Sequence, residues 1–440
     1  MKIAIVGSGI AGLGAALALH RKYNIKLFEK NPKFGGHSNT YELNVDNREF
    51  NVDTGFIVYN EENYPNLTSL FRELSVPTKM SNMSFGFSSG GGKLEYSGSS
   101  LSALFATRKN LFSTKFLFGL REILRFNKEA PLEMDMGKLS NLSLGDYLKR
   151  HRHGDWFIKN FILPMGGAIW STPAINILEF PATNFISFFR NHGLLAGWSA
   201  AHSWKTVDGG SKVYVNEIIN ALGVNAILDS QVNSVERVEN GVKLNFLEPS
   251  RSEIFDHVIL CCSAQDAANM LVSKTDRESE VLNCFKTEKN RAVLHCDTRL
   301  MPKRRTTWSS WNFMTAGEAE SLTKPSSVTY WMNKLQSIDE KYPFFVTLNP
   351  IFEPAQEKVF EELEYLHPIF NQASFDAQAA IETIQGDGGV WYGGAWLGYG
   401  FHEDGLTSGL RVADALGARP GWAINVPPLL SKNSCLKAAE

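Results

Sequence analysis

The chain opens with Lys2-Ile-Ala-Ile-Val-Gly7-Ser-Gly9-Ile-Ala-Gly12, a short apolar run that ends in three spaced glycines. A helix-forming segment follows, which gives the strand–turn–helix pattern of a dinucleotide-binding site. Gly7 permits the tight turn, Gly9 lets the backbone approach a pyrophosphate, and Gly12 allows the helix to pack on the strand. Ile10 and Ala11 begin the helix, whose free N–H groups face the phosphates. The segment therefore predicts a nucleotide site at the start of an α/β domain.

An acidic residue follows at the spacing that such a site requires. The second apolar run, Ile25-Lys-Leu-Phe28, is expected to form a strand, and Glu29 comes directly after it, twenty-two residues beyond Gly7. A carboxylate at this distance accepts hydrogen bonds from the ribose hydroxyls. We therefore predict that Glu29 holds the ribose, with Lys30 beside it.

Length, charge and cysteine content narrow the classes of function. The 440 residues predict two or three domains, and the net charge of −2 argues against nucleic acid as a partner. An apolar run after Lys2 also resembles a secretory signal, but a signal needs neither the glycine spacing nor the later carboxylate. The five cysteines lack CxxC spacing, so we interpret them as reduced cytoplasmic thiols, neither disulfides nor a zinc site: Cys261, Cys262, Cys284, Cys296 and Cys435.

Two segments bear on contact with a membrane. Residues 161–178 are uncharged, but Pro164, the pair at 166–167 and Pro173 are expected to break them as a helix, so we interpret them as a buried pocket wall. Residues 104–128 instead interleave aromatic and basic side chains around a single acid, Glu122. Such a stretch either lies on an anionic bilayer as a peripheral contact or forms an ordinary surface helix with one core face. Both interpretations stay open.

The residues after Glu29 discriminate between dinucleotides. Gly35 and Gly36 let the chain pass close to a ligand already held at the first turn, and His37 follows them. This arrangement resembles the FAD signature of the glutathione-reductase and amine-oxidase superfamily, in which an arginine usually occupies the position of His37. The resemblance implies FAD rather than NAD, bound non-covalently because no Cys or His attachment motif is apparent. It also implies contacts from Ser38, Thr54 and Gly55.

The middle of the chain continues the resemblance. A glycine turn at 208–210 leads into a helix over about 213–221, and strand-like runs follow at 226–228, 231–238, 242–246 and 255–261. In the superfamily such a segment returns to the FAD domain, and the residue at Val232 clamps the adenine with its backbone.

The C-terminal segment predicts the third part of the cofactor site. From Gly388 to Ala413 the sequence indicates a strand, a glycine-rich loop containing Gly394, and a helix. Superfamily members point the N-terminus of this helix at the flavin pyrimidine, where the helix dipole stabilises the negative charge of the reduced ring. We expect the backbone N–H groups of His402, Gly405 and Leu406 to make that contact.

The whole chain also resembles a narrower bacterial family of amine-oxidase-like FAD-binding proteins. The matching phrases include Asn184-Phe-Ile-Ser-Phe-Phe-Arg-Asn-His192, Trp308-Ser-Ser-Trp-Asn312, Thr329-Tyr-Trp-Met-Asn333 and Tyr399-Gly-Phe-His-Glu-Asp-Gly-Leu406. A similar module forms the N-terminal half of plant cyclopropane fatty acid synthases, and another is the flavin desaturase of furan fatty acid synthesis. The resemblance implies a role in fatty-acyl modification, on a lipid acyl substrate, with a methyltransferase or cyclopropane synthase as a partner.

Candidate catalytic and substrate residues lie near these motifs. In amine oxidases two aromatic side chains cage the amine, and Phe401 occupies one of those places here without a hydroxyl. Trp170 and Asn191 are expected to line the same cavity. A neutral histidine is a suitable proton acceptor for a flavin dehydrogenation, which makes His192 and His402 candidates, with Glu403 beside the latter.

The expected fold is α/β, with an interrupted Rossmann-like FAD domain and a mixed helical and β-sheet substrate domain. The FAD domain is predicted over 1–85, 200–270 and 385–432, and the substrate domain over 86–199 and 271–384, with a frayed tail from about Leu430. Three functions stay open: an FAD-dependent desaturase of lipid acyl chains, a flavin amine or small-molecule oxidase, and a non-catalytic FAD-binding partner of a fatty-acid methyltransferase.

Overall fold

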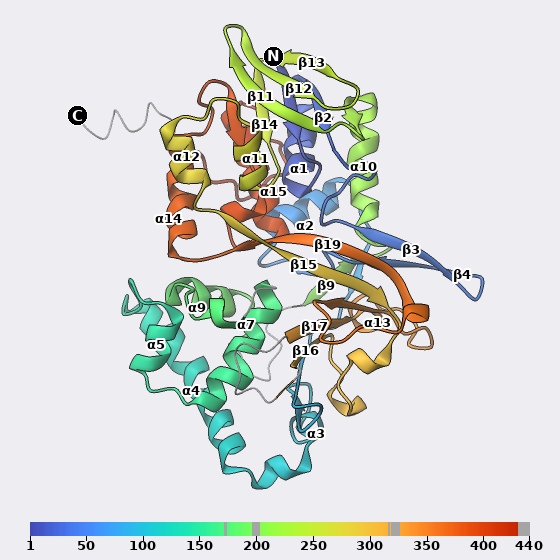
Figure 1. Cartoon of the computed structure of the whole chain (residues 1–440), viewed down its shortest axis with the longest axis vertical. Helices are drawn as coiled ribbons and strands as arrows, with labels where there is room; N and C mark the ends of the chain where they lie inside the picture. Colours follow the sequence, from blue (N-terminus) through green and yellow to red (C-terminus); the bar gives the residue numbers. More distant parts are fainter. Residues whose placement is uncertain (171–173, 196–202, 316, 318–325, 430–440) are drawn as a thin grey trace.

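A parallel sheet of five strands organises the upper half of the molecule (Figure 1). The structure is a computed structural model that describes residues 1–170, 174–195, 203–315, 317 and 326–429. Pro173, Cys435 and the expected tail from Leu430 therefore lie outside the described residues. The strand order is β10 (Ala226–Ile227), β2 (Asn24–Phe28), β1 (Lys2–Val6), β14 (His257–Leu260) and β20 (Val390–Tyr392). The parallel pairing confirms the predicted α/β class.

Alternate residues of β1 face two different cores, because a central strand is covered on both sides. Ile3 and Ile5 pack with α1 (Ile10–Leu19), α10 (Lys212–Leu222) and α15 (His402–Ala415). Ala4 and Val6 pack on the opposite face. That face is covered by an antiparallel sheet and three helices: β11 (Val232–Val238), β12 (Gly241–Phe246), β13 (Arg251–Phe255), α11 (Ala264–Met270), α12 (Asp276–Leu282) and α14 (Gln372–Ala380).

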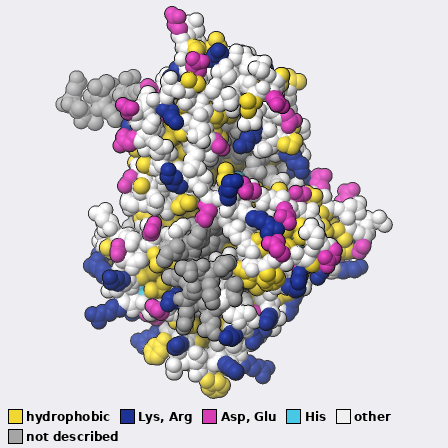
Figure 2. Space-filling view, in the orientation of Figure 1, with side chains coloured by type: hydrophobic (Ala, Val, Ile, Leu, Met, Phe, Trp, Pro, Cys, Tyr) yellow, Lys and Arg dark blue, Asp and Glu magenta, His cyan; other side chains and the backbone are white. Residues whose placement is uncertain are grey.

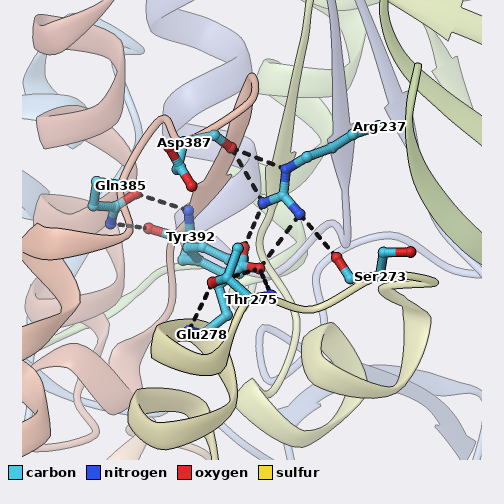
Figure 3. Close-up of polar contacts among 7 residues, drawn as sticks. All are labelled: Arg237, Ser273, Thr275, Glu278, Gln385, Asp387 and Tyr392. Atoms are coloured by element: carbon cyan, nitrogen blue, oxygen red, sulfur yellow. Dashed lines mark hydrogen bonds and ion pairs between the residues drawn. The ribbon is translucent and has the colours of Figure 1, made fainter. Parts of the chain in front are cut away.

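A buried ion pair fixes β20 against these elements (Figure 3). Arg237 of β11 donates to Glu278 of α12 at 2.5 Å and to the carbonyl of Asp387 at 3.2 Å. The Tyr392 hydroxyl donates to the same carboxylate at 2.5 Å, and the Tyr392 backbone is held by Gln385. The network holds the end of β20, from which the glycine-rich loop leads into α15.

The lower half of the molecule contains a seven-stranded sheet and a group of helices (Figure 1). The sheet order is β19 (Val359–Ile369), β15 (Lys286–His295), β18 (Phe345–Leu348), β17 (Ser326–Trp331), β16 (Trp311–Thr315), β7 (Phe85–Ser89) and β8 (Leu94–Ser97). β16 pairs with β7 in parallel, whereas the other neighbours are antiparallel. The short helix α13 (Met332–Leu335) follows β17.

The helices of this half come mainly from one stretch of chain, residues 101–191. They are α3 (Leu101–Leu104), α4 (Thr114–Asp135), α5 (Leu144–Arg150), α6 (Asp155–Phe157), α7 (Leu163–Trp170), α8 (Ala174–Ile177) and α9 (Ala182–Asn191). They enclose an aromatic core of their own around Phe126, Phe157 and Phe185. No helix among the described residues has the length and apolar character needed to cross a membrane.

The prediction that Pro164 and the glycine pair at 166–167 break the helix is wrong. The chain remains helical from Asp155 to Trp170, with a π-turn at Ile158–Ile162. Proline removes the N–H that would otherwise bond the carbonyl four residues earlier. That carbonyl belongs to Asn160, and it accepts instead from the Tyr96 hydroxyl at 2.5 Å. The segment is nevertheless largely buried, as expected for a wall.

Several short elements connect the two halves. The hairpin β3 (Thr40–Val45) and β4 (Arg48–Asp53) packs Leu43 and Val52 into the core of the seven-stranded sheet. A small sheet joins β5 (Tyr59–Asn60), β9 (Trp204–Val207) and β6 (Thr78–Met80), and α2 (Pro65–Glu73) packs beside α15. Residues of the first 85 therefore contribute to both halves.

Candidate functional site

The glycine turn after β1 leaves an open cradle. Gly7 has a φ of +100°, and a Cβ on Gly12 would stand 1.9 Å from the Gly7 carbonyl oxygen, so the helix packs directly on the turn. A Cβ on Gly9 would instead meet no atom within 4 Å. No side chain caps the N-terminus of α1 and its first turn holds no acid. Unsatisfied N–H groups beside open space suit an anionic phosphate.

Glu29 lies at the edge of this turn with both carboxylate oxygens engaged. One oxygen accepts from the backbone N–H of Ser8 at 3.0 Å and its hydroxyl at 2.7 Å. The other accepts from the backbone and side-chain amides of Asn31, each at 2.9 Å. These donors fix the carboxylate, so ribose hydroxyls would share or displace them. Lys30, next to it, is exposed.

The segment that leads to Val232 runs beside the backbone of Glu29. The backbone N–H of Ser230 donates to the Glu29 carbonyl at 2.8 Å, and Val232 is buried at the start of β11. This position fits the expected adenine contact, which stays a prediction.

The second glycine pair continues the cradle. Gly36 has a φ of +59°, and a Cβ there would approach Gly9 Cα at 3.2 Å. The Gly35 N–H donates to the Ser8 hydroxyl at 3.1 Å. A Cβ on Gly55 would lie 2.2 Å from the His37 carbonyl oxygen, to which the Phe56 N–H donates. The predicted residues of both segments therefore lie together.

His37 lies where the two halves of the molecule meet. Its ring stacks on Tyr365 with centroids 4.8 Å apart and lies 5.5 Å from His367, and both partners come from β19 of the lower sheet. The ring is solvent-accessible although protein surrounds it, as expected for a side chain that lines an internal space. Burial lowers the pKa of His37 to about 4 and that of His367 to about 3. Thr54 anchors this contact, because its hydroxyl lies 2.9 Å from that of Tyr365.

The N-terminus of α15 converges on that of α1. A Cβ on Gly405 would lie 2.8 Å from the Ile10 side chain, and one on Gly409 would lie 2.2 Å from the Ala11 carbonyl oxygen. Leu406 fills the space above Gly14. The N-terminus of α1 carries about half a positive charge and no acid in its first turn, so it favours an anion.

One expected contact in α15 is corrected. The Gly405 N–H donates to the Phe401 carbonyl at 3.0 Å, so it is committed to the helix, and Leu406 lies one residue further in. Only the first N–H groups of a helix lack such partners, which leaves His402 and its two successors. Gly394 lies in the preceding loop, where its N–H donates to the Ser408 hydroxyl at 2.8 Å.

The side chain of His402 belongs to a polar cluster. Its Nε2 lies 3.0 Å from the hydroxyls of both Ser38 and Tyr214, and these two hydroxyls are also hydrogen-bonded to each other. The ring stacks on Phe56 at 3.8 Å. Burial, with a smaller effect of His37, holds the pKa of His402 well below its ordinary value. The ring is therefore neutral and fixed by several neighbours.

The two acids after His402 serve the backbone. Glu403 accepts from the N–H groups of Asn66 and Leu67 at 2.8 and 2.9 Å, at the N-terminus of α2. Asp404 accepts from Tyr399 and Phe401 at 3.0 and 2.9 Å. Burial raises the pKa of Glu403 to about 7 and that of Asp404 to about 6, against these hydrogen bonds. Both carboxyls hold loops that border the cavity.

An aromatic group forms the far end of the site. Phe188 of α9 stacks on Phe401 at 4.9 Å and on His192 at 3.8 Å, and Trp170 lies 4.8 Å from Phe188. Phe188, one helical turn before His192, thus brings the predicted residues Trp170, His192 and Phe401 together. Asn191 is exposed, and its carbonyl accepts from Asn63.

Several residues of the site were not predicted: Phe56, Tyr214, Tyr365, His367 and, as a site residue, Phe188. Phe188 could have been found from its i,i+4 spacing to His192 on one helix. No comparable local pattern in the sequence identifies Tyr365 and His367 of β19 as site residues.

Comparison with known proteins identifies the fold. Residues 5–74 match the model of the NAD(P)-binding Rossmann-like domain. Putrescine oxidase in a putrescine-bound structure is 16% identical, with a TM-score of 0.68 over 95% of this chain and 100% of that one. Cyclohexylamine oxidase from Brevibacterium oxydans is 15% identical, with a TM-score of 0.68 over 94% and 98%. A CLA-producing fatty acid isomerase from P. acnes is 13% identical, with a TM-score of 0.66 over 94% and 97%.

These matches extend over nearly the whole chain and therefore concern both halves of the molecule. No curated protein matches the chain by sequence. The likeness confirms a mixed α/β fold that includes a Rossmann-like domain. It establishes architecture, and function has to be argued from the site.

Proposed function

We propose that the chain is an FAD-dependent oxidoreductase that dehydrogenates a lipid acyl chain. The proposal rests on four groups that adjoin one another in the structure. They are the open cradle at Gly9, the neighbouring Gly36 and His37, the N-terminus of α15, and the aromatic group around Phe401. The first part suits a dinucleotide and the last an apolar substrate.

The residues present fit FAD. The uncapped end of α1 and the space at Gly9 suit the pyrophosphate, and Glu29 suits the ribose. When bound, the flavin would accept a hydride from the substrate. The dipole of α15 would favour negative charge on the reduced ring, and the His402 side chain, held in a cluster of hydroxyls, adds no charge of its own.

The electrostatics of the aromatic end favour an acyl chain over an amine. An ammonium group needs a nearby carboxylate or an electron-rich cage with polar handles. The two acids next to Phe401 are engaged by backbone N–H groups, and Phe401 itself has no hydroxyl. A hydrocarbon needs no such partners.

His192 is the best candidate for the proton acceptor. Its Nδ1 lies 3.0 Å from the Phe188 carbonyl oxygen, which can only accept, so Nδ1 carries a proton. The Phe188 ring against its face fixes the orientation at the aromatic end of the site. His402 is less suitable because its Nε2 is already shared by two hydroxyls.

Replacing His192 tests this role. His192→Gln should lower the rate of substrate-dependent flavin reduction by about 10²–10⁴-fold, the usual contribution of a general base, with bound flavin unchanged. The matched control is His20→Gln, since His20 Nδ1 makes a similar bond to the Leu17 carbonyl at 2.7 Å on the opposite half of the molecule. Equal rates in both variants would remove His192 from the mechanism.

The function itself is tested with purified protein. Acid precipitation should release all bound flavin, identified as FAD by mass spectrometry, and anaerobic mixing with a monounsaturated phospholipid should bleach its visible absorbance. Putrescine and cyclohexylamine serve as competing substrates. If amines bleach the flavin and lipids do not, the chain is an amine oxidase and the acyl proposal is wrong.

A further inference from the structure

A projecting surface at the lower end of the molecule exposes large apolar side chains (Figures 1 and 2). We call it the tip surface, and it consists of exposed residues of α3, the short turn Arg108–Phe112 and the first half of α4: Leu101, Arg108, Lys109, Leu111, Phe112, Lys115, Leu117, Phe118 and Arg121. Phe112 is 90% exposed, Leu101 70% and Phe118 63%. Single exposed apolar residues are ordinary, but a cluster of this kind indicates an interaction site.

The packing of α4 does not require these side chains. Its buried face is formed by Phe116, Gly119, Phe126 and Ala130, and Trp156 covers Gly119. Of the aromatic residues in the predicted basic and aromatic segment, Phe116 and Phe126 therefore belong to the core. Leu117 and Phe118 point the other way, on a helix whose core face is already complete.

The charge of the surface indicates its partner. Every exposed charged residue from 101 to 128 is basic, and among the described residues no ion pair involves Arg108, Lys109, Lys115 or Arg121. Glu122 is engaged by Arg125 and by the Gly154 N–H, and Asp155 nearby pairs with Lys159. A convex surface that mixes aromatic and unpaired basic groups complements a fluid anionic bilayer.

We infer that the tip surface docks the protein on an anionic lipid bilayer, with Phe112 and Phe118 entering the acyl region and the basic side chains at the level of the phosphates. The inference rests on this surface alone and adds a membrane partner to the proposed function. The helical core that begins at Phe126 of α4 also contains Trp170 and Phe188, so the docked face and the aromatic end of the site belong to one packed unit.

Vesicle sedimentation of the full chain tests the inference. Vesicles of phosphatidylcholine with phosphatidylglycerol should bind the protein at low salt and release it at high salt, whereas pure phosphatidylcholine should bind far less. Lys115→Gln with Arg121→Gln should lower the partition coefficient about 25-fold, fivefold for each charge. Phe112→Ser with Phe118→Ser should lower it by about tenfold or more.

Matched controls lie elsewhere on the surface. Lys274→Gln and Val224→Ser change an exposed base and a 94% exposed apolar residue of the upper half, and both should bind vesicles as the wild type does. Flavin content and turnover of detergent-dispersed substrate should be normal in every tip variant, so failure of docking and failure of the proposed chemistry are separable. Equal binding to neutral vesicles, or a dimer in light scattering that tip variants abolish, would overturn the inference.

Discussion

Single glycines and carboxyls determine what the cavity can accept. Gly9 and Gly12 are three residues apart, yet one borders open space and the other presses on the backbone of Gly7. The sequence predicts Glu403 as a catalytic residue beside His402, but its carboxylate oxygens accept hydrogen bonds from the first turn of α2. The neighbours of each residue therefore decide its role. Gly9 borders space for a ligand, whereas Gly12 and Glu403 serve backbone packing and backbone hydrogen bonds.

The two glycines give opposite expectations for one added methyl group. Gly9 has a φ of −64°, so Gly9→Ala should fold with a free energy of unfolding within about 0.5 kcal/mol of the wild type. The methyl group would occupy the phosphate space and abolish bound FAD, measured by visible absorbance. Gly12→Ala should instead be destabilised strongly in urea unfolding, because its Cβ meets the Gly7 carbonyl. Normal FAD content in Gly9→Ala would show that the cradle is not the phosphate site.

Glu403 should give stability an unusual dependence on pH. Its folded-state pKa of about 7 lies above the ordinary value, so the folded state holds the extra proton and loses stability as pH rises through 7. Glu403→Gln should be less stable than the wild type, since Asn66 and Leu67 donate to different oxygens of Glu403 and the NH2 of glutamine cannot accept from one of them. The difference in unfolding free energy should be about 1 kcal/mol smaller at pH 8 than at pH 6. Urea unfolding at both values measures this, and a constant difference would contradict the raised pKa.

Pairs of elements position the residues of the site. α1 and α15 cross so closely that Gly14 and Gly409 have no room for a side chain. β19 brings Tyr365 and His367 from the lower sheet to His37 of the upper half. The cavity thus has one wall from each half, and neither half completes it alone.

The crossing of α1 and α15 can be tested by a single substitution. In Gly409→Ala the added Cβ would lie 2.2 Å from the Ala11 carbonyl oxygen and separate the two helices. We expect a loss of about 1–3 kcal/mol in unfolding free energy together with weaker FAD binding. Gly421→Ala is the control, because a Cβ there meets nothing within 4 Å. If both variants bind FAD equally well, the helix ends need not converge for binding.

At the scale of the whole molecule, buried imidazoles dominate the response to acid. Burial lowers the pKa of six of the ten histidines: His37, His153, His257, His295, His367 and His402. In the unfolded chain these groups bind protons below about pH 6.5, and in the folded chain only at lower pH. Asp53, Glu403 and Asp404 have raised pKa values and oppose the effect, but they are fewer.

Stability should therefore fall between pH 7 and pH 5. A fully buried imidazole with a folded pKa of about 4, such as that of His295, costs about 2 kcal/mol over this interval. Urea unfolding at pH 7, 6 and 5 should show a steady loss, and His295→Gln should show a smaller one. The comparison with His20→Gln isolates the effect of burial. A pH-independent unfolding free energy would mean that these rings are protonated in the folded chain.

The sequence predicts those parts of the molecule whose signal is local. The glycine turn, the helix from Ile10 and the strand–loop–helix ending in α15 each follow from a short pattern. β19 was not predicted, because it contains three glutamates, which are depleted in strands, and its register depends on pairing with β15. The continuous helix through Pro164 depends on the hydroxyl of Tyr96, sixty-eight residues away in the chain. Long-range partners of this kind leave no mark in a local pattern.

The pairing of α1 with α15 also constrains how the protein is made in the cell. All ten residues of α1 are buried, and the helix that covers it ends at Ala415, so α1 leaves the ribosome long before its cover exists. During most of translation this apolar segment needs a chaperone or a provisional partner. The proposed FAD site includes both helix ends, so we expect the cofactor to be loaded only after synthesis is nearly complete. A chain truncated before His402 should accordingly be handled by the cell as a misfolded protein.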